Sequence, residues 1–122
     1  MDYQRLVQRI ESAKKTNTIG KNAMGFALYV TGVKDREIFI DPKGFSVPKN
    51  FEPVRTFDEC DVVWLPESLD GMLLVREGRN SSRVHYRTGY EKPIASEDFS
   101  IAIDNMNSFG IWTKKRTYYL VR

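Results

Sequence analysis

The apolar residues of this chain follow two different periods, and no apolar run is long. The first of these periods has the i, i+3, i+4, i+7 spacing of one helical face and is carried by Tyr3, Leu6, Val7, Ile10 and Ala13. Polar residues fill the opposite face, which predicts an amphipathic helix over residues 3–15. From Gly25 the period changes to two, which is typical of β-strands. The chain is therefore expected to fold as a helix in front of a sheet.

The segment after this helix is predicted to form a β-hairpin. Residues 25–31 alternate between two faces, and residues 36–40 form a second short run after a tight connection. Residues 45–58 carry two prolines and three phenylalanines without a clear period. We expect a long ordered loop there, either functional or held to the core by its phenylalanines.

The middle of the chain contains three further strand patterns. Residues 62–65 and 72–75 are continuous apolar runs separated by a proline and an Asp-Gly turn signal, which is typical of central strands buried on both faces. Residues 83–87 alternate, and their polar face consists of Arg83, His85 and Arg87. The plain structural interpretation of that face is a solvent-facing strand whose charges keep a sheet edge soluble.

The C-terminal third is predicted to hold one helix and one hairpin. Ser96 can cap a helix over about residues 96–108, with Gly110 just past its end, although the same residues also alternate as a strand would. Residues 109–113 and 117–122 are aromatic-rich runs around a basic turn and favour a terminal hairpin. The predicted fold class is α+β, with two helices on a mostly antiparallel sheet of five to seven strands.

Length and composition favour one independently folding domain over residues 1–122. The chain has 122 residues, 41% hydrophobic and 29% charged, which is far from the composition of disordered proteins. No run approaches the length that spans a bilayer, and the N-terminal segment lacks a secretory h-region, so a cytoplasmic location without membrane association is expected. The formal charge of +3 permits an acidic partner without requiring one.

The sequence offers little support for a metal or cofactor site. Cys60 is the only cysteine and lies beside acidic residues, so we interpret it as a buried structural residue rather than a nucleophile. One histidine, one cysteine and dispersed acids disfavour a zinc site, and the glycines form no phosphate-binding loop. No cofactor is predicted.

Residues 76–92 are the most suggestive segment for function, because they gather four arginines, the only histidine and two tyrosines around a turn and a strand. Guanidinium groups and turn hydroxyls suit phosphate oxygens. The predicted phosphate or nucleic-acid contacts are Arg79, Ser82, Arg83, His85 and Arg87. The same residues also supply an enzymatic hypothesis, a small metal-independent ribonuclease in which His85 works with Glu77 or Glu91 and with Arg83 and Arg87.

The terminal hairpin is a second candidate surface. Lys114, Lys115 and Arg116 lie among aromatic residues, a pattern that suits single-stranded nucleic acid. The aromatic contacts predicted for this surface and the preceding one are Trp112, Tyr90 and Tyr118. Because Tyr118 and Tyr119 point to opposite faces of a regular strand, at least one of them is expected in the core.

Taken together, these patterns favour a small non-enzymatic binding module that acts by occupying a macromolecular partner. The partner is either a nucleic acid or another protein, and a protein interface would use the long loop and exposed tyrosines. The ribonuclease is the alternative. The oligomeric state is left open by the sequence.

Overall fold

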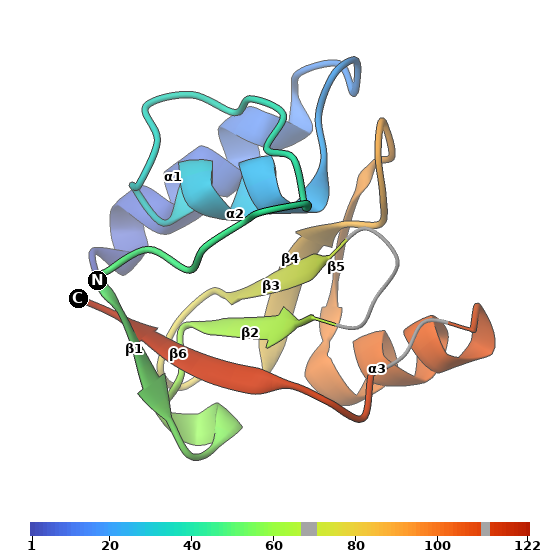
Figure 1. Ribbon diagram of the computed structural model, residues 1–122. Coiled ribbons are helices and arrows are strands. Elements are labelled where there is room, and N and C mark those ends of the chain that lie inside the picture. Colours follow the sequence, from blue (N-terminus) through green and yellow to red (C-terminus); the bar gives the residue numbers. More distant parts are fainter. Residues whose placement is uncertain (67–70, 111–112) are drawn as a thin grey trace.

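A six-stranded antiparallel sheet supports the helices in the computed structural model, which describes residues 1–66, 71–110 and 113–122 (Figure 1). The strands lie in the order β1-β6-β2-β3-β4-β5, and every neighbouring pair is antiparallel. Their bounds are Phe51–Val54, Val62–Leu65, Met72–Arg76, Arg83–Arg87, Ile94–Asp98 and Thr117–Val121, for β1 to β6 in chain order. The α+β prediction is confirmed.

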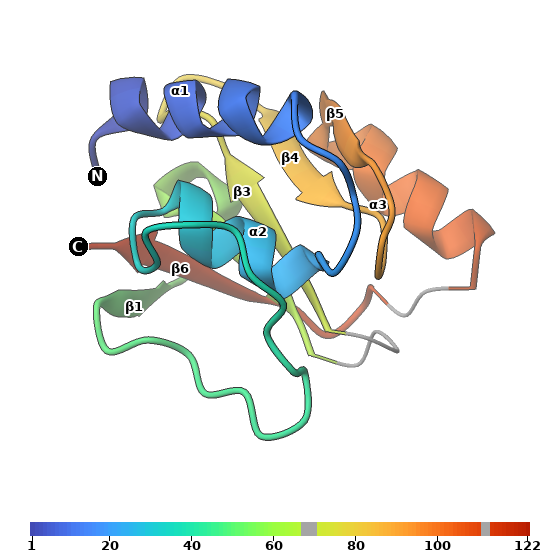
Figure 2. The same ribbon diagram turned by 90° about the horizontal axis from the view of Figure 1, so that it is seen from above.

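Three helices pack on the two faces of this sheet. Helix α1 (Tyr3–Lys14) and helix α2 (Ala23–Val30) lie side by side on one face, as the view from above shows (Figure 2). Helix α3 (Phe99–Ser108) covers part of the other face. None of the described helices has the length and apolar character needed to cross a bilayer.

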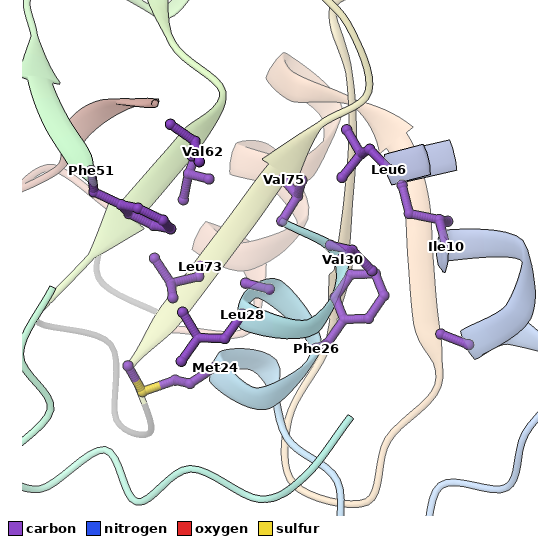
Figure 3. Close-up of a cluster of buried hydrophobic side chains, with 13 residues drawn as sticks. Leu6, Ile10, Met24, Phe26, Leu28, Val30, Phe51, Val62, Leu73 and Val75 are labelled. Carbon is purple, nitrogen blue, oxygen red and sulfur yellow. The ribbon is translucent and has the colours of Figure 1, made fainter. Parts of the chain in front are cut away.

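Each face of the sheet has its own apolar cluster, because alternate residues of β2 and β3 point to opposite sides. On the α1 and α2 side, Val62, Leu73 and Val75 pack against residues of both helices (Figure 3). On the α3 side, Val63 and Leu74 pack against that helix and against Cys60. The prediction that 62–65 and 72–75 are central strands buried on both faces is confirmed, as is the burial of Cys60.

The predicted strand over residues 25–31 is wrong, because these residues belong to helix α2. The side chain of Asn22 caps the helix by accepting a hydrogen bond from the amide of Gly25 at 3.0 Å. Gly32, at φ 88°, ends it with the two backbone bonds of a Schellman motif. The helix is buried on nearly all sides, so its sequence is apolar throughout and carries no clear period.

The 36–40 segment is also not a strand. It runs as extended chain beside α2, and Asn22 fixes it through two hydrogen bonds to the backbone of Ile40, at 2.7 and 3.2 Å. The backbone of Ile38 lies directly against Gly25. The predicted hairpin is therefore replaced by helix α2 and by residues 36–40, which pack on this helix and which we call the strap.

The predicted loop over 45–58 contains more structure than expected, namely strand β1 and a 3-10 turn at Phe57–Glu59. Its three phenylalanines do hold it to the core: Phe45 contacts Trp64, Phe51 is buried, and Phe57 stacks on Phe99 with centroids 4.3 Å apart. Pro53 lies in β1, an edge strand, where its missing amide is tolerated.

Two boundaries near the C-terminus also differ from the prediction. Residues 94–98 form strand β5, and the N-cap of α3 is Asp98 rather than Ser96, with its carboxylate accepting from the amide of Ser100. The C-terminal strand β6 is present, but its neighbours are β1 and β2, so it does not pair with the described part of the 109–113 run. Residues 111 and 112 lie outside the described residues.

Candidate functional site

Strand β4 presents Arg83, His85 and Arg87 on one face, as the alternation predicts, but that face is largely covered. β4 lies between β3 and β5, and its polar residues point to the side on which α1 and α2 pack. Arg87 is 1% exposed and His85 is 4% exposed, whereas Arg83 is exposed. The interpretation of this face as a solvent-facing sheet edge is wrong.

His85 links two neighbouring segments through both of its ring nitrogens. Nε2 lies 2.7 Å from Oε2 of Glu77, and Nδ1 lies 2.6 Å from Oγ of Ser96. Burial lowers the pKa of His85, although Glu77 acts in the opposite direction. A neutral ring donates its Nε2 proton to the Glu77 carboxylate and accepts at Nδ1 from the Ser96 hydroxyl. The predicted acid–base pair, His85 and Glu77, is therefore in contact.

This network predicts a loss of stability in acid. The pKa of His85 is lower in the folded chain than its ordinary value of 6.5, so the unfolded chain takes up the proton first. The contribution of neutral His85 to the free energy of unfolding is complete above pH 6.5. It declines as the pH falls below 6.5, by at most about 1.4 kcal/mol per pH unit. Burial acts to raise the pKa of Glu77, but the hydrogen bonds from His85 and Ser81 and the nearby charges outweigh it. The pKa of Glu77 is therefore lowered, which adds the same trend below pH 4.5.

Urea unfolding between pH 7.5 and 5.0 measures this effect, with His85→Gln as the control because glutamine keeps hydrogen-bonding capacity without titrating. We expect the wild-type free energy of unfolding to fall more steeply with acid than that of the variant. Identical slopes for the two chains would contradict the assignment.

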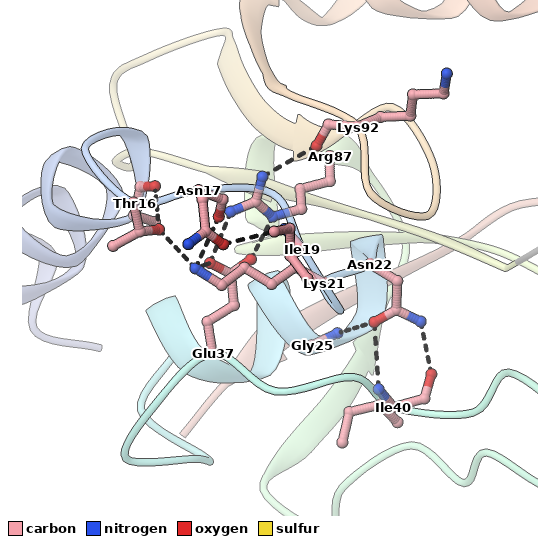
Figure 4. Close-up of polar contacts among 11 residues, drawn as sticks. Thr16, Asn17, Ile19, Lys21, Asn22, Gly25, Glu37, Ile40, Arg87 and Lys92 are labelled. Atoms are coloured by element: carbon pink, nitrogen blue, oxygen red, sulfur yellow. Dashed lines mark hydrogen bonds and ion pairs between the residues drawn. The ribbon is translucent and has the colours of Figure 1, made fainter.

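Arg87 belongs to a buried cluster that joins the end of β4 to the strap (Figure 4). Its Nε and Nη2 atoms both donate to the carboxylate of Glu37, which is only 5% exposed, and its Nη1 donates to the carbonyl of Lys92. Lys21 lies 3.9 Å from the same carboxylate. This bidentate pair occupies the guanidinium group that the sequence assigned to phosphate.

The three predicted contacts near the β3–β4 turn are exposed, but each holds a neighbouring group. Arg79 donates from Nε to the hydroxyl of Tyr3, beside the buried carboxylate of Asp61. Ser82 donates to Asp98 at 2.5 Å, and Arg83 donates to the carbonyl of Ser96 at 3.1 Å. Their role as phosphate contacts stays a prediction.

The C-terminal basic turn exposes two of its three basic residues. Lys114 and Lys115 are exposed, while Arg116 donates to the carbonyl of Thr113 and lies over the ring of Phe99. Tyr118 and Tyr119 are half-buried, and each packs against the apolar cluster of its own face. Trp112 lies outside the described residues, so its predicted contact role is unaddressed by the structure.

Tyr90 is the predicted aromatic contact that the structure places most openly. It is 50% exposed and meets Phe39, itself 46% exposed, edge to face with centroids 5.5 Å apart. The two rings line a hollow of about 260 Å³ together with Asn22 and Pro42. We call Phe39, Tyr90 and Pro42 the aromatic corner.

The two segments that carry this corner are both anchored. The strap is fixed by Asn22 and by the pair of Glu37 with Arg87, as described above. The β4–β5 loop is tied by the amide of Glu91, which donates to the carbonyl of Lys21 at 2.8 Å. Phe39 was missed in the sequence because residues 36–40 were assigned to a hairpin, where alternation placed it without a distinct role.

Comparisons with known proteins supply no relative. No family model matches the chain, and neither the curated proteins nor the solved structures contain a significant match. Among residues 1–66, 71–110 and 113–122, no three His, Cys, Asp or Glu side chains gather as metal ligands would.

Proposed function

We propose that this chain is a cytoplasmic, non-enzymatic binding module that occupies a protein partner through the aromatic corner. The observation that carries the proposal is the edge-to-face contact of two half-exposed rings, Phe39 and Tyr90, which lie 51 residues apart in the sequence. Large exposed aromatic groups anchor protein interfaces. Because both segments are fixed to the core, ordering them on binding costs little entropy.

The charges beside the corner favour a protein over a nucleic acid. Asp41 and Lys43 follow the strap directly, and Glu91 and Lys92 follow Tyr90 in the β4–β5 loop, so two acids and two bases flank the corner. A polyanion is bound by an excess of free cations, and here Arg87 and Lys21 are engaged by Glu37. Ile19 is an exposed apolar residue in the neighbouring 15–22 loop. It adds apolar surface to the end of the molecule that carries the aromatic corner.

Affinity capture from cells that encode the chain tests the proposal, followed by calorimetry with the purified captured protein. We expect Phe39→Ser combined with Tyr90→Ser to weaken binding at least about 100-fold, as loss of two anchor residues does. Ile101→Ser, at an exposed apolar residue on α3, is the matched control and should bind normally. Equal binding by all three chains would contradict the proposal.

A ribonuclease is the second candidate, and the contact of His85 with Glu77 is the observation in its favour. It ranks second because both ring nitrogens of His85 are engaged and Arg87 is held by Glu37. Labelled RNA incubated with the chain and a metal chelator provides the test. Cleavage that is lost in His85→Gln would support the enzyme. A salt-sensitive gel shift without cleavage would instead favour nucleic-acid binding through Lys114, Lys115 and Arg116 or through Arg79 and Arg83.

A further inference from the structure

The face of the sheet opposite to α1 and α2 contains a second cavity, of about 610 Å³, between α3 and strands β4 and β5. This volume lies within the range of small-molecule sites. Among the described residues, helix α3 packs on this face, and the small side chain of Ala95 in β5 lines the cavity. Met72, Met106 and Phe109 contribute its apolar walls.

One carboxylate faces this apolar space in a fixed orientation. Glu97 accepts a hydrogen bond from the hydroxyl of Tyr86 at one oxygen and from Nδ2 of Asn105, at 3.0 Å, at the other. Burial, followed by the neighbouring Glu97, raises the pKa of Tyr86, so its phenol remains a donor at neutral pH. Since both partners donate to it, both oxygens of Glu97 act as acceptors.

Glu97 retains capacity for a further partner. A carboxylate offers about four accepting positions, of which two are used here. Among the described lysines and arginines, none forms an ion pair with it. Lys92 also lines the cavity, but its exposed side chain forms no ion pair with Glu97. A half-buried carboxylate at an apolar wall favours a positively charged group in the ligand.

We propose that this cavity binds an organic amine with an apolar body, whose ammonium group pairs with Glu97 while the body lies against Met72, Met106 and Phe109. The polar end of such a ligand meets the Glu97 carboxylate, and its apolar end contacts the buried methionines and covers Phe109, which is 83% exposed. The flexible thioether side chains can adapt to bodies of different shape.

A ligand series with the unmodified full chain tests the charge preference by calorimetry or by NMR titration. Tryptamine, 3-ethylindole and indole-3-acetate share one aromatic body and differ in charge. We expect tryptamine to bind at least about tenfold more tightly than indole-3-acetate, with the neutral compound between them. A tryptamine Kd weaker than about 1 mM, or equal affinities for the amine and the acid, would overturn the proposal.

Two variants locate the site. Glu97→Gln keeps an acceptor for Tyr86 but removes the charge, so it should abolish the preference for the amine over the acid. Ala95→Leu should weaken all three ligands by filling the cavity. If Glu97→Gln folds poorly, Ala95→Leu and the ligand series still decide the outcome. The double variant at Phe39 and Tyr90 should bind tryptamine normally, which separates this proposal from the protein interface.

Discussion

Replacing Arg87 with methionine is expected to reduce the free energy of unfolding by about 3 kcal/mol, because it leaves the Glu37 carboxylate buried without its bidentate partner. Both side chains are almost fully buried, with 1% and 5% of their surface exposed. The substitution also removes the donor to the carbonyl of Lys92. Lys21, 3.9 Å from Glu37, compensates only in part and keeps the loss near the lower end of the range for broken buried pairs.

The double variant Arg87→Met with Glu37→Leu is the matched control, because it removes both charges together. Apolar residues of similar volume often replace a buried pair with little loss. We therefore expect the double variant to recover most of the stability that the single variant loses, as measured by chemical denaturation of all three chains. A double variant as unstable as Arg87→Met alone would show that the pair does not act as a unit.

Replacing Gly25 with alanine is expected to cost about 3 kcal/mol or more, at the upper end of overpacking effects. A Cβ atom there would lie 1.7 Å from the backbone carbonyl oxygen of Ile38. This obstacle is backbone, and Asn22 fixes the same strap through Ile40, so the strap cannot move aside without breaking those bonds. Alanine favours a helix more than glycine does. This gain is smaller than the loss expected when the strap separates from α2.

Gly78→Ala provides the control for Gly25→Ala, because a Cβ at residue 78 meets no heavy atom within 4 Å. Thermal unfolding of the two variants beside the wild type measures the difference. We expect Gly78→Ala to unfold within a few degrees of the wild type, and Gly25→Ala to unfold far earlier or to remain unfolded. Similar melting of the two variants would contradict the close packing of α2 on the strap.

The elements that could be predicted are those in which the spacing of apolar residues directly reflects which faces are buried. Helix α1 has one buried and one solvated face, so its period is plain. Strands β2 and β3 are buried on both faces, and their short continuous apolar runs between turn signals identified them. In each case the local pattern and the tertiary surroundings agree.

Helix α2 could not be identified from its period, because a helix buried on nearly all sides is apolar at every position. Its ends did carry a signal: Asn22 precedes the apolar run as an N-cap, and Gly32 follows it at the position of a C-terminal glycine. The eight residues of the helix also match a strand in length. The strap was misassigned for a related reason, since its partner is a helix face rather than another strand.

The candidate site shows what sequence spacing can and cannot supply. Alternation correctly placed Arg83, His85 and Arg87 on one face, but the elements that cover that face come from the first 40 residues. The partner of Arg87 is Glu37, 50 residues earlier, and no local pattern links the two. The contact of Phe39 with Tyr90 likewise depends on this long-range packing.

The polar residues of β4 thus have a structural explanation, and the exposed rings at one end of the molecule carry the proposed function. Arg87 and Glu37 hold the strap, and the strap presents Phe39 beside Tyr90. In this proposal, the buried charges hold the strap in place and the aromatic corner contacts the partner.

Photo-crosslinking from position 90 tests this account most directly, because it reports contact at the proposed surface itself. A photoreactive phenylalanine at Tyr90, and separately at Ile101, is irradiated in cells that encode the chain. The account predicts one defined protein adduct from position 90 that disappears with Phe39→Ser, and none from position 101. Adducts from position 101 alone, or adducts to nucleic acid from position 90, would contradict it.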